Sequence, residues 1–291
     1  MTIDSLLYAL IGLYHTLWIP VEIAHYDGTG IQEAQARGID VTYDAYAYIA
    51  GSSILGAVLP VWTYEDGVKA MLERIVDSKI RDKIKKELKK RVSAGNDWNT
   101  VVIAYLSNEK NKQYEGRSIG EIARVEKSDP IDVVCNLLLE EKGKGMCIFR
   151  NSRNECYVFN NLRDSNNYIM SDGWGIAPYA PIRKGLPHPR AYGAFPRVLG
   201  RYVRECRTIS LQEAIRKMTW GPAQKLGITD RGLLRESLWA DITIFNPATI
   251  CDKATFDDPH QYPVGVEHVL VNGQITIQKG EHTEVRAGKI I

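Results

Sequence analysis

The sequence predicts an α/β fold that contains part of a parallel TIM-type barrel, and three observations support this prediction. Short apolar runs lie at residues 19–24, 39–43 and 168–170, and each leads into polar side chains. Helical patterns separate these runs, as in the β-α-β units of a parallel sheet. From residue 232 onward the pattern changes to alternating strands with turn signals. We therefore expect a partial barrel, a helical insertion and a C-terminal β-sandwich portion.

The first part of the barrel is expected at residues 1–63. A strand at 19–24 ends at His25, and a short helix at 31–37 is followed by Gly38, which is typical of a helix end. A second strand at 39–43 ends at Asp44. Catalytic residues of a parallel barrel follow the carboxyl ends of its strands, so both side chains are candidate site residues.

The insertion is expected at residues 64–128. Residues 68–92 show the pattern of one long amphipathic helix with a basic second half. A basic helix can bind nucleic acid, but the interleaved Asp82 and Glu87 favour an ordinary solvated face. A strand at 101–106 and a short helix at 118–125 complete this region.

The rest of the barrel is expected at residues 129–231, where Pro130 suits the first turn of a helix. Ser210 and Glu213 have the spacing of a capping box that opens another helix. The predicted helices are 131–142, 154–162, 210–218 and 222–226, and the predicted strands are 146–149 and 168–172.

The β-sandwich portion is expected at residues 232–291. Strands are predicted at 240–245, 268–271 and 274–278, and Asn272-Gly273 is a strong signal for a hairpin turn between the last two.

Composition restricts the class of protein. The 291 residues are 44% hydrophobic and 25% charged with a net charge of +2, which suits a globular protein without strong attraction to nucleic acid or membranes. The five cysteines are scattered without a paired motif, which indicates reduced thiols and a cytoplasmic location. Residues 6–21 are largely apolar, but Asp4 precedes them and Pro20 interrupts them, so we expect a buried helix that leads into the first strand.

The strongest candidate site is Asp172 with the Gly- and Pro-rich loop after it, which carries His188 and Arg190. A carboxylate at a strand end can move a proton, and an arginine can bind a carboxylate through two parallel hydrogen bonds. These groups together predict a site for an anionic substrate. The alternatives are that Asp172 caps a turn and that His188 is structural within a rigid loop. His188 could instead orient Arg190 or contact substrate, while Arg197 is expected to tie the loop to the next helix.

The order of several short motifs resembles the D-aminoacylase (N-acyl-D-amino-acid deacylase) family of the amidohydrolase superfamily. The motifs are Asp44-Ala45-Tyr46-Ala47-Tyr48, Gly51-Ser52-Ser53, Ser171-Asp172-Gly173, Pro187-His188-Pro189-Arg190, Phe195-Pro196-Arg197-Val198-Leu199-Gly200, Trp239-Ala240-Asp241 and Val271-Asn272-Gly273. The resemblance implies a barrel of the metal-dependent hydrolase kind that hydrolyses N-acyl-D-amino acids by means of a zinc-activated water.

The resemblance also implies roles for individual residues. Asp172 would be the catalytic general acid and base and a metal ligand, and His25 would be the second metal ligand. Arg190 would hold the substrate carboxylate. Further substrate contacts are implied for four side chains, Tyr46, Tyr48, Ser52 and Ser53.

The chain departs from the family pattern in ways that suggest only the C-terminal part of such an enzyme. Ala47 replaces a proline, and neither a His-x-His motif nor the family's early cysteine ligand occurs. One alternative is therefore a truncated, non-catalytic remnant that needs a complementing N-terminal chain or forms an oligomer. Another is a related hydrolase acting on a different amide, although Pro187-His188-Pro189-Arg190 favours N-acyl amino acids, a small-molecule substrate.

Overall fold

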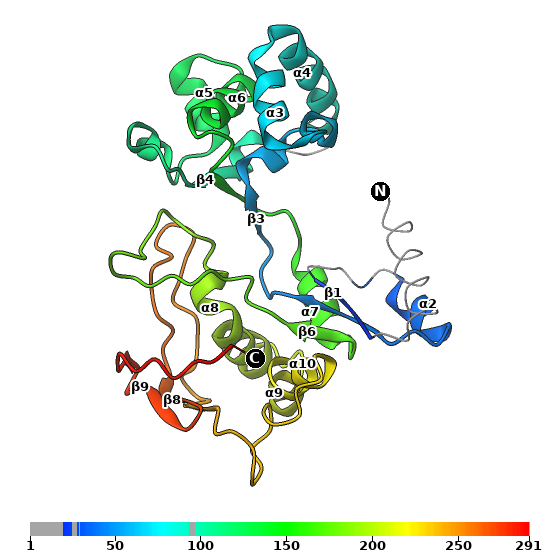
Figure 1. Cartoon of the computed structure of the whole chain (residues 1–291), viewed down its shortest axis with the longest axis vertical. Coiled ribbons are helices and arrows are strands. Elements are labelled where there is room, and N and C mark those ends of the chain that lie inside the picture. The colour runs from blue at the N-terminus through cyan, green and yellow to red at the C-terminus, as the bar shows by residue number, and fades with distance from the viewer. Residues whose placement is uncertain (1–19, 25–27, 29, 93–96, 291) are drawn as a thin grey trace.

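The computed structural model describes residues 20–24, 28, 30–92 and 97–290, and these residues form three sheets with helices around them. In Figure 1 a lobe containing β3, β4 and α3 to α6 lies above a lower half that contains the other two sheets. The expected N-terminal helix at 6–21 lies almost wholly outside the described residues. No described helix is both long and apolar enough to span a bilayer.

The parallel sheet has the strand order β1-β2-β6 and contains β1 (Val21–Ile23), β2 (Val41–Ala45) and β6 (Asn167–Ile169). The helix α2 (Ile31–Ala36) connects the first two strands, and its apolar side packs against the sheet through Ile31. This arrangement confirms the predicted strand–helix–strand unit, since β1 and β2 pair in parallel. The partial barrel and the sandwich stay predictions.

The middle lobe is built on an antiparallel sheet of order β3-β5-β4. Its strands are β3 (Gly51–Ile54), β4 (Val101–Tyr105) and β5 (Met146–Phe149). The prediction that residues 146–149 continue the barrel is wrong, because β5 pairs on both sides with strands of this lobe. The lobe's sheet therefore runs from Gly51 to Phe149, which is wider than the expected insertion at 64–128.

Helices cover one side of this sheet and bury a large apolar core that includes Met71, Ile75 and Ile103. They are α3 (Gly67–Val76), α4 (Ser78–Val92), α5 (Ile119–Glu126) and α6 (Pro130–Glu140), with short 3-10 turns η1 (Leu55–Val58), η2 (Val61–Tyr64), η3 (Trp98–Thr100) and η4 (Glu109–Tyr114). The single helix predicted at 68–92 is two helices. Asp77 is extended between them, and its Oδ1 accepts the N–H of Lys79, so it begins the second helix.

The lower half also contains α7 (Glu155–Arg163), which precedes β6, and a run of helices after residue 189. These are α8 (Arg190–Arg197), the π-helical segment η5 (Val198–Glu205), α9 (Leu211–Met218) and α10 (Trp220–Lys225). The Ser210 hydroxyl accepts the N–H of Glu213, which confirms Ser210 as the N-cap of α9, while the Glu213 carboxylate binds Arg216. The sequence pattern did not predict α8 and η5, because Gly193 and Pro196 are typical of loops.

The last sheet has the order β10-β9-β8-β7 and is antiparallel throughout. Its strands are β7 (Ile242–Phe245), β8 (Val266–Val271), β9 (Gln274–Gln278) and β10 (Glu281–His282). Asn272 and Gly273 both have positive φ, at 49° and 78°, which confirms the predicted tight hairpin turn.

Candidate active site

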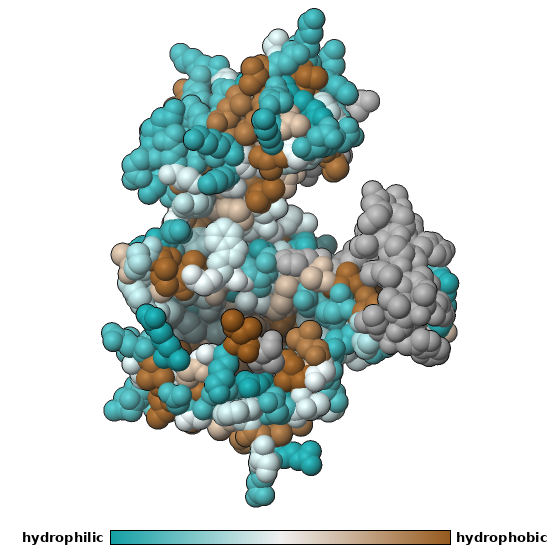
Figure 2. Space-filling view, viewed as in Figure 1, coloured by the Kyte–Doolittle hydropathy of each residue, from teal (hydrophilic) through white to brown (hydrophobic). Residues whose placement is uncertain are grey.

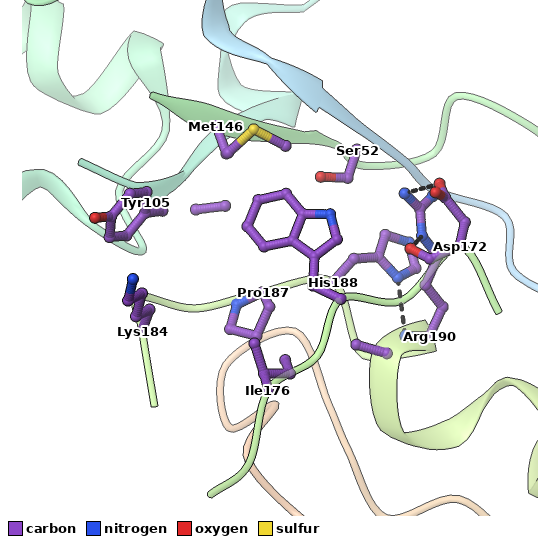
Figure 3. A pocket seen from close by; sticks show the side chains of 12 residues that line it. Ser52, Tyr105, Met146, Asp172, Ile176, Lys184, Pro187, His188 and Arg190 are labelled. Atoms are coloured by element: carbon purple, nitrogen blue, oxygen red, sulfur yellow. Dashed lines mark hydrogen bonds and ion pairs between the residues drawn. The ribbon is translucent and has the colours of Figure 1, made fainter. Parts of the chain in front are cut away.

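A pocket lies between the antiparallel sheet of the middle lobe and the loop that leads from β6 to α8 (Figure 3). The sheet contributes Ser52 from β3, Ala104 and Tyr105 from β4, and Met146 from β5. The loop contributes the other lining residues, namely Asp172, Trp174, Ile176, Lys184, Pro187 and His188, and the start of α8 adds Arg190 and Ala191. The site is therefore shared by two parts of the fold.

Asp172 lies three residues beyond the end of β6, so it is placed by a turn and not by the strand itself. Its φ of 45° is left-handed, which an aspartate tolerates better than most residues and which ends the extended run. The carboxylate is about one-quarter exposed and forms an ion pair with the guanidinium of Arg190. The predicted catalytic carboxylate and the predicted carboxylate-binding arginine are thus in direct contact.

Arg190 is the first residue of α8 and is 5% exposed. Its Nε donates to the carbonyl of Asp172 at 3.2 Å, and its guanidinium carbon lies 4.3 Å from the ring centroid of Tyr46. Its Nη1 is buried without a hydrogen-bond partner in the described part of the chain. Burial lowers the pKa of Arg190, while Tyr46 and Asp172 oppose this shift. A buried guanidinium with a spare donor favours the binding of an anion.

His188 holds the start of α8 in place. Its Nδ1 accepts the backbone N–H of Arg190 at 3.1 Å, and its Nε2 lies 3.1 Å from the carbonyl of Ala50, to which a protonated Nε2 donates. Burial and the nearby Arg190 lower the pKa of His188 to about 3, so the ring is neutral at ordinary pH. Of the roles weighed for this residue, the geometry corresponds to orienting Arg190.

The tyrosines predicted to contact substrate are both buried and bond to protein groups. The Tyr46 hydroxyl accepts from Arg153, and the Tyr48 hydroxyl donates to Asp252 at 3.2 Å. Neither belongs to the residues that line the pocket. The ring of Tyr46 instead packs against the guanidinium of Arg190. Tyr48 packs edge-on against His188, with ring centroids 5.1 Å apart.

Of the two serines predicted to contact substrate, Ser52 lines the pocket, while Ser53 does not. Adjacent residues of a strand point to opposite faces, which explains the difference. The lining residues that were not identified as site residues from the sequence include Tyr105, Met146, Trp174 and Lys184. Two of them come from strands of the middle lobe, and no local motif signals that this lobe reaches the site.

The described residues do not fit a resident metal by themselves. No group of three or more His, Cys, Asp or Glu side chains comes together among them, whereas a zinc site usually has at least three protein ligands. Asp172 is already paired with Arg190. The other predicted ligand, His25, lies outside the described residues.

Comparisons with known proteins agree with the resemblance found in the sequence. Residues 177–277 match a model of the amidohydrolase family. Two relatives come from Alcaligenes xylosoxydans xylosoxydans. An N-acyl-D-glutamate deacylase is 32% identical to this chain, and the match covers 84% of this chain and 40% of the relative. A D-aminoacylase is 29% identical, and that match covers 94% of this chain and 49% of the relative. The chain spans about half the length of these relatives or less.

Solved structures give the same result. A D-aminoacylase studied for its binuclear metal centre superimposes with a TM-score of 0.74 and 28% identity over 98% of this chain and 52% of its own. The N-acyl-D-glutamate deacylase of Bordetella bronchiseptica, solved with zinc and a phosphonate inhibitor, has a TM-score of 0.70 at 24% identity, over 94% of this chain and 50% of its own. The chain is thus a homologue of the D-aminoacylases and N-acyl-D-glutamate deacylases of the amidohydrolase family, and it spans only part of their length.

Proposed function

We propose that this chain supplies the amino-acid-binding part of a site that hydrolyses the amide bond of N-acyl-D-amino acids. The observation that supports this proposal is the buried Arg190, whose Nη1 has no partner among the described residues while Nη2 holds Asp172. An N-acyl amino acid presents a free α-carboxylate, and a guanidinium binds such a group through charge-assisted hydrogen bonds. In this proposal, Arg190 holds the α-carboxylate beside Asp172.

Asp172 is proposed as the group that moves the proton. A water molecule attacks the acyl carbonyl carbon and transfers a proton to the Asp172 carboxylate. The carbon–nitrogen bond then breaks, and the leaving nitrogen takes this proton from Asp172. The products are a carboxylate and a free D-amino acid, and Asp172 acts first as a base and then as an acid.

Zinc is the cofactor that the homologues suggest, but its ligands are not brought together by the described residues. His25 is the proposed ligand within this sequence, and further ligands would belong to a complementing polypeptide. The proton transfers proposed for Asp172 do not depend on the position of that metal.

A non-catalytic chain that folds against such a polypeptide is the second candidate, and two observations favour it. The described parallel sheet has only three strands, so β1 and β6 are both edge strands. Parallel sheets are usually covered by other parts of a protein, and edge strands can pair with another chain. An apolar groove of about 470 Å³ also lies between α8, α9 and the last sheet, lined by residues such as Phe195, Met218 and Val269. Figure 2 shows apolar patches at the surface of this lower half.

Metal content separates the two candidates. We expect the chain, isolated together with its complementing polypeptide in the presence of zinc, to hold at least one zinc per complex, and we expect His25→Ala and Asp172→Ala to lower this zinc content. A folded complex without zinc would instead support the non-catalytic candidate. Comparison of N-acetyl-D-amino acids with cyclic amides as substrates separates the proposed reaction from that of a related hydrolase.

Binding tests the carboxylate clamp without requiring turnover. We expect Arg190→Met to weaken the binding of N-acetyl-D-amino acids about 10- to 100-fold in calorimetry, because a hydrogen-bonded charge pair contributes roughly 1.5–3 kcal/mol. Arg183→Met removes the same charge from the adjoining loop, outside the pocket lining, and should bind like the wild type. Equal affinity in Arg190→Met and wild type would contradict the clamp.

A further inference from the structure

Arg153 bonds together the two segments that connect the middle lobe to the lower half. The chain enters the lobe through residues 46–50, between β2 and β3, and leaves it through residues 150–154, between β5 and α7 (Figure 1). The backbone N–H of Arg153 donates to the carbonyl of Ile49 at 2.9 Å, and its guanidinium donates to the Tyr46 hydroxyl. One connection is therefore fixed to the other next to the residue that packs against Arg190.

Tyr46 contacts two guanidinium groups. The guanidinium carbon of Arg190 lies 4.3 Å from its ring centroid, and that of Arg153 lies 5.1 Å from the same centroid. A cation is attracted to an aromatic ring, and the attraction increases when water is excluded. The Tyr46 side chain is buried, so both contacts are shielded from solvent. The position of this ring thus determines where the guanidinium of Arg190 lies.

The charge of Arg153 is not balanced by a carboxylate. Arg190 pairs with Asp172, whereas Arg153 has no ion pair within the part of the chain that the structure describes. Its guanidinium lies instead between tyrosines, with the ring centroid of Tyr157 at 4.7 Å. Burial lowers the pKa of Arg190, and the charge of Arg153 adds to this effect. An anion bound at Arg190 would offset this repulsion.

We propose that Arg153 is a positioning residue that acts on Arg190 through Tyr46. This inference rests on the proposed function, in which Arg190 holds the α-carboxylate. The hydrogen bond from Arg153 fixes the Tyr46 hydroxyl, and the fixed ring then holds the guanidinium of Arg190 in its binding position. An arginine that is ordered before the ligand arrives loses less conformational entropy on binding. Arg153 does not line the pocket and acts without touching the ligand.

The test measures the binding of N-acetyl-D-alanine by calorimetry on the chain isolated with its complementing polypeptide. Arg153→Met should weaken binding about fivefold, within the range of couplings between residues of one network. In a Tyr46→Phe background, which keeps the ring and removes the hydroxyl, Arg153→Met should have no further effect. Arg153→Lys keeps the charge and a donor, so it should recover most of the affinity, and it replaces Arg153→Met if that variant fails to fold.

Arg163→Met is the matched control. It removes an exposed arginine at the end of α7, whose guanidinium lies near the ring of Phe159, and it should bind like the wild type. Wild-type affinity in Arg153→Met, an equal loss in Arg163→Met, or the same loss from Arg153→Met in both backgrounds would overturn the positioning role. The proposed function would still stand in these cases if Arg190→Met abolished binding. No binding by the wild type would overturn both proposals.

Discussion

His188 illustrates how burial determines the chemistry of a single residue. The ring lies among Tyr46, Tyr48 and Phe256, and both of its nitrogens are engaged with the backbone. Its charged form is disfavoured by desolvation and by Arg190, and the residue acts through the position of Arg190 and not through proton transfer. His188 therefore positions Arg190 beside the Asp172 carboxylate.

The low pKa of His188 predicts a specific pH dependence of stability. The folded pKa of about 3 lies below the usual value of 6.5, so between these values the unfolded chain binds a proton that the folded chain does not. The stabilisation is complete above about pH 6.5 and is lost as the pH falls towards 3. Urea unfolding should show a loss of about 2 kcal/mol between pH 8 and pH 5 from this residue.

The control is His188→Asn, in which this part of the pH dependence disappears. Burial raises the pKa of Glu22 to about 7, and this residue changes the pH dependence of stability in the opposite direction. The wild type and the variant must therefore be compared. As the pH falls, Glu22 binds a proton in the folded chain before it does in the unfolded chain, so it stabilises the fold as the pH falls through 7. Identical pH profiles for wild type and His188→Asn would contradict the assignment.

At the scale of elements, the helix α8 carries Arg190 into the site because its N-terminal half packs closely against other segments. Gly193 lies where a Cβ atom would come 2.6 Å from the Tyr48 hydroxyl and 2.7 Å from the Cβ of Asp252. Both of these neighbouring side chains are mostly buried. The glycine thus permits close packing of the helix, which explains why a residue with low helix propensity occurs within it.

Gly193→Ala should therefore destabilise the protein although alanine favours helices by about 1 kcal/mol. We expect a net loss of about 1–3 kcal/mol in urea unfolding because overpacking outweighs the propensity gain. Gly175→Ala is the matched control, since a Cβ at that position meets no atom within 4 Å, and its effect should stay within about 0.5 kcal/mol. A neutral or stabilising Gly193→Ala would show that α8 can shift without cost.

At the scale of the whole molecule, an ion pair joins three segments that are far apart in the sequence. Arg197 in α8 donates to the carbonyl of Ala47 at 3.0 Å and forms a 3.0 Å ion pair with Asp252, to which Tyr48 also donates. Arg197 does not tie its loop to the following helix as expected from the sequence. It is itself the last residue of α8, and it connects this helix to the segment after β2 and to the segment after β7.

Asp252→Ala should cost about 3 kcal/mol of stability, because it leaves a mostly buried guanidinium without its partner. The exposed pair of Arg150 with Asp257 is the matched control, and Asp257→Ala should change stability by less than about 0.5 kcal/mol. Thermal or urea unfolding provides the measurement. Arg197→Met combined with Asp252→Ala should cost less than the sum of the single changes, and strict additivity would show that the pair does not interact.

Local signals in the sequence determined much of the secondary structure. The strands at β1, β2, β4 and β6, the cap of α9 and the Asn272-Gly273 hairpin depend on nearby residues, so patterning and capping rules identify them. The sequence also identified Asp172 and Arg190 as candidate site residues, because each stands in a motif that carries chemistry, but it did not predict the ion pair between them. Helix α8 was missed because tertiary packing overrides the loop tendency of Gly193 and Pro196.

The tertiary structure alone decided which distant segments meet at the pocket. It placed β5 in the middle lobe and brought Tyr105 and Met146 opposite Arg190. It also buried Tyr46, Tyr48 and His188 beneath the site, so that they support Arg190. Strand pairing and burial depend on contacts between residues far apart in the chain, and no local pattern of side chains contains that information.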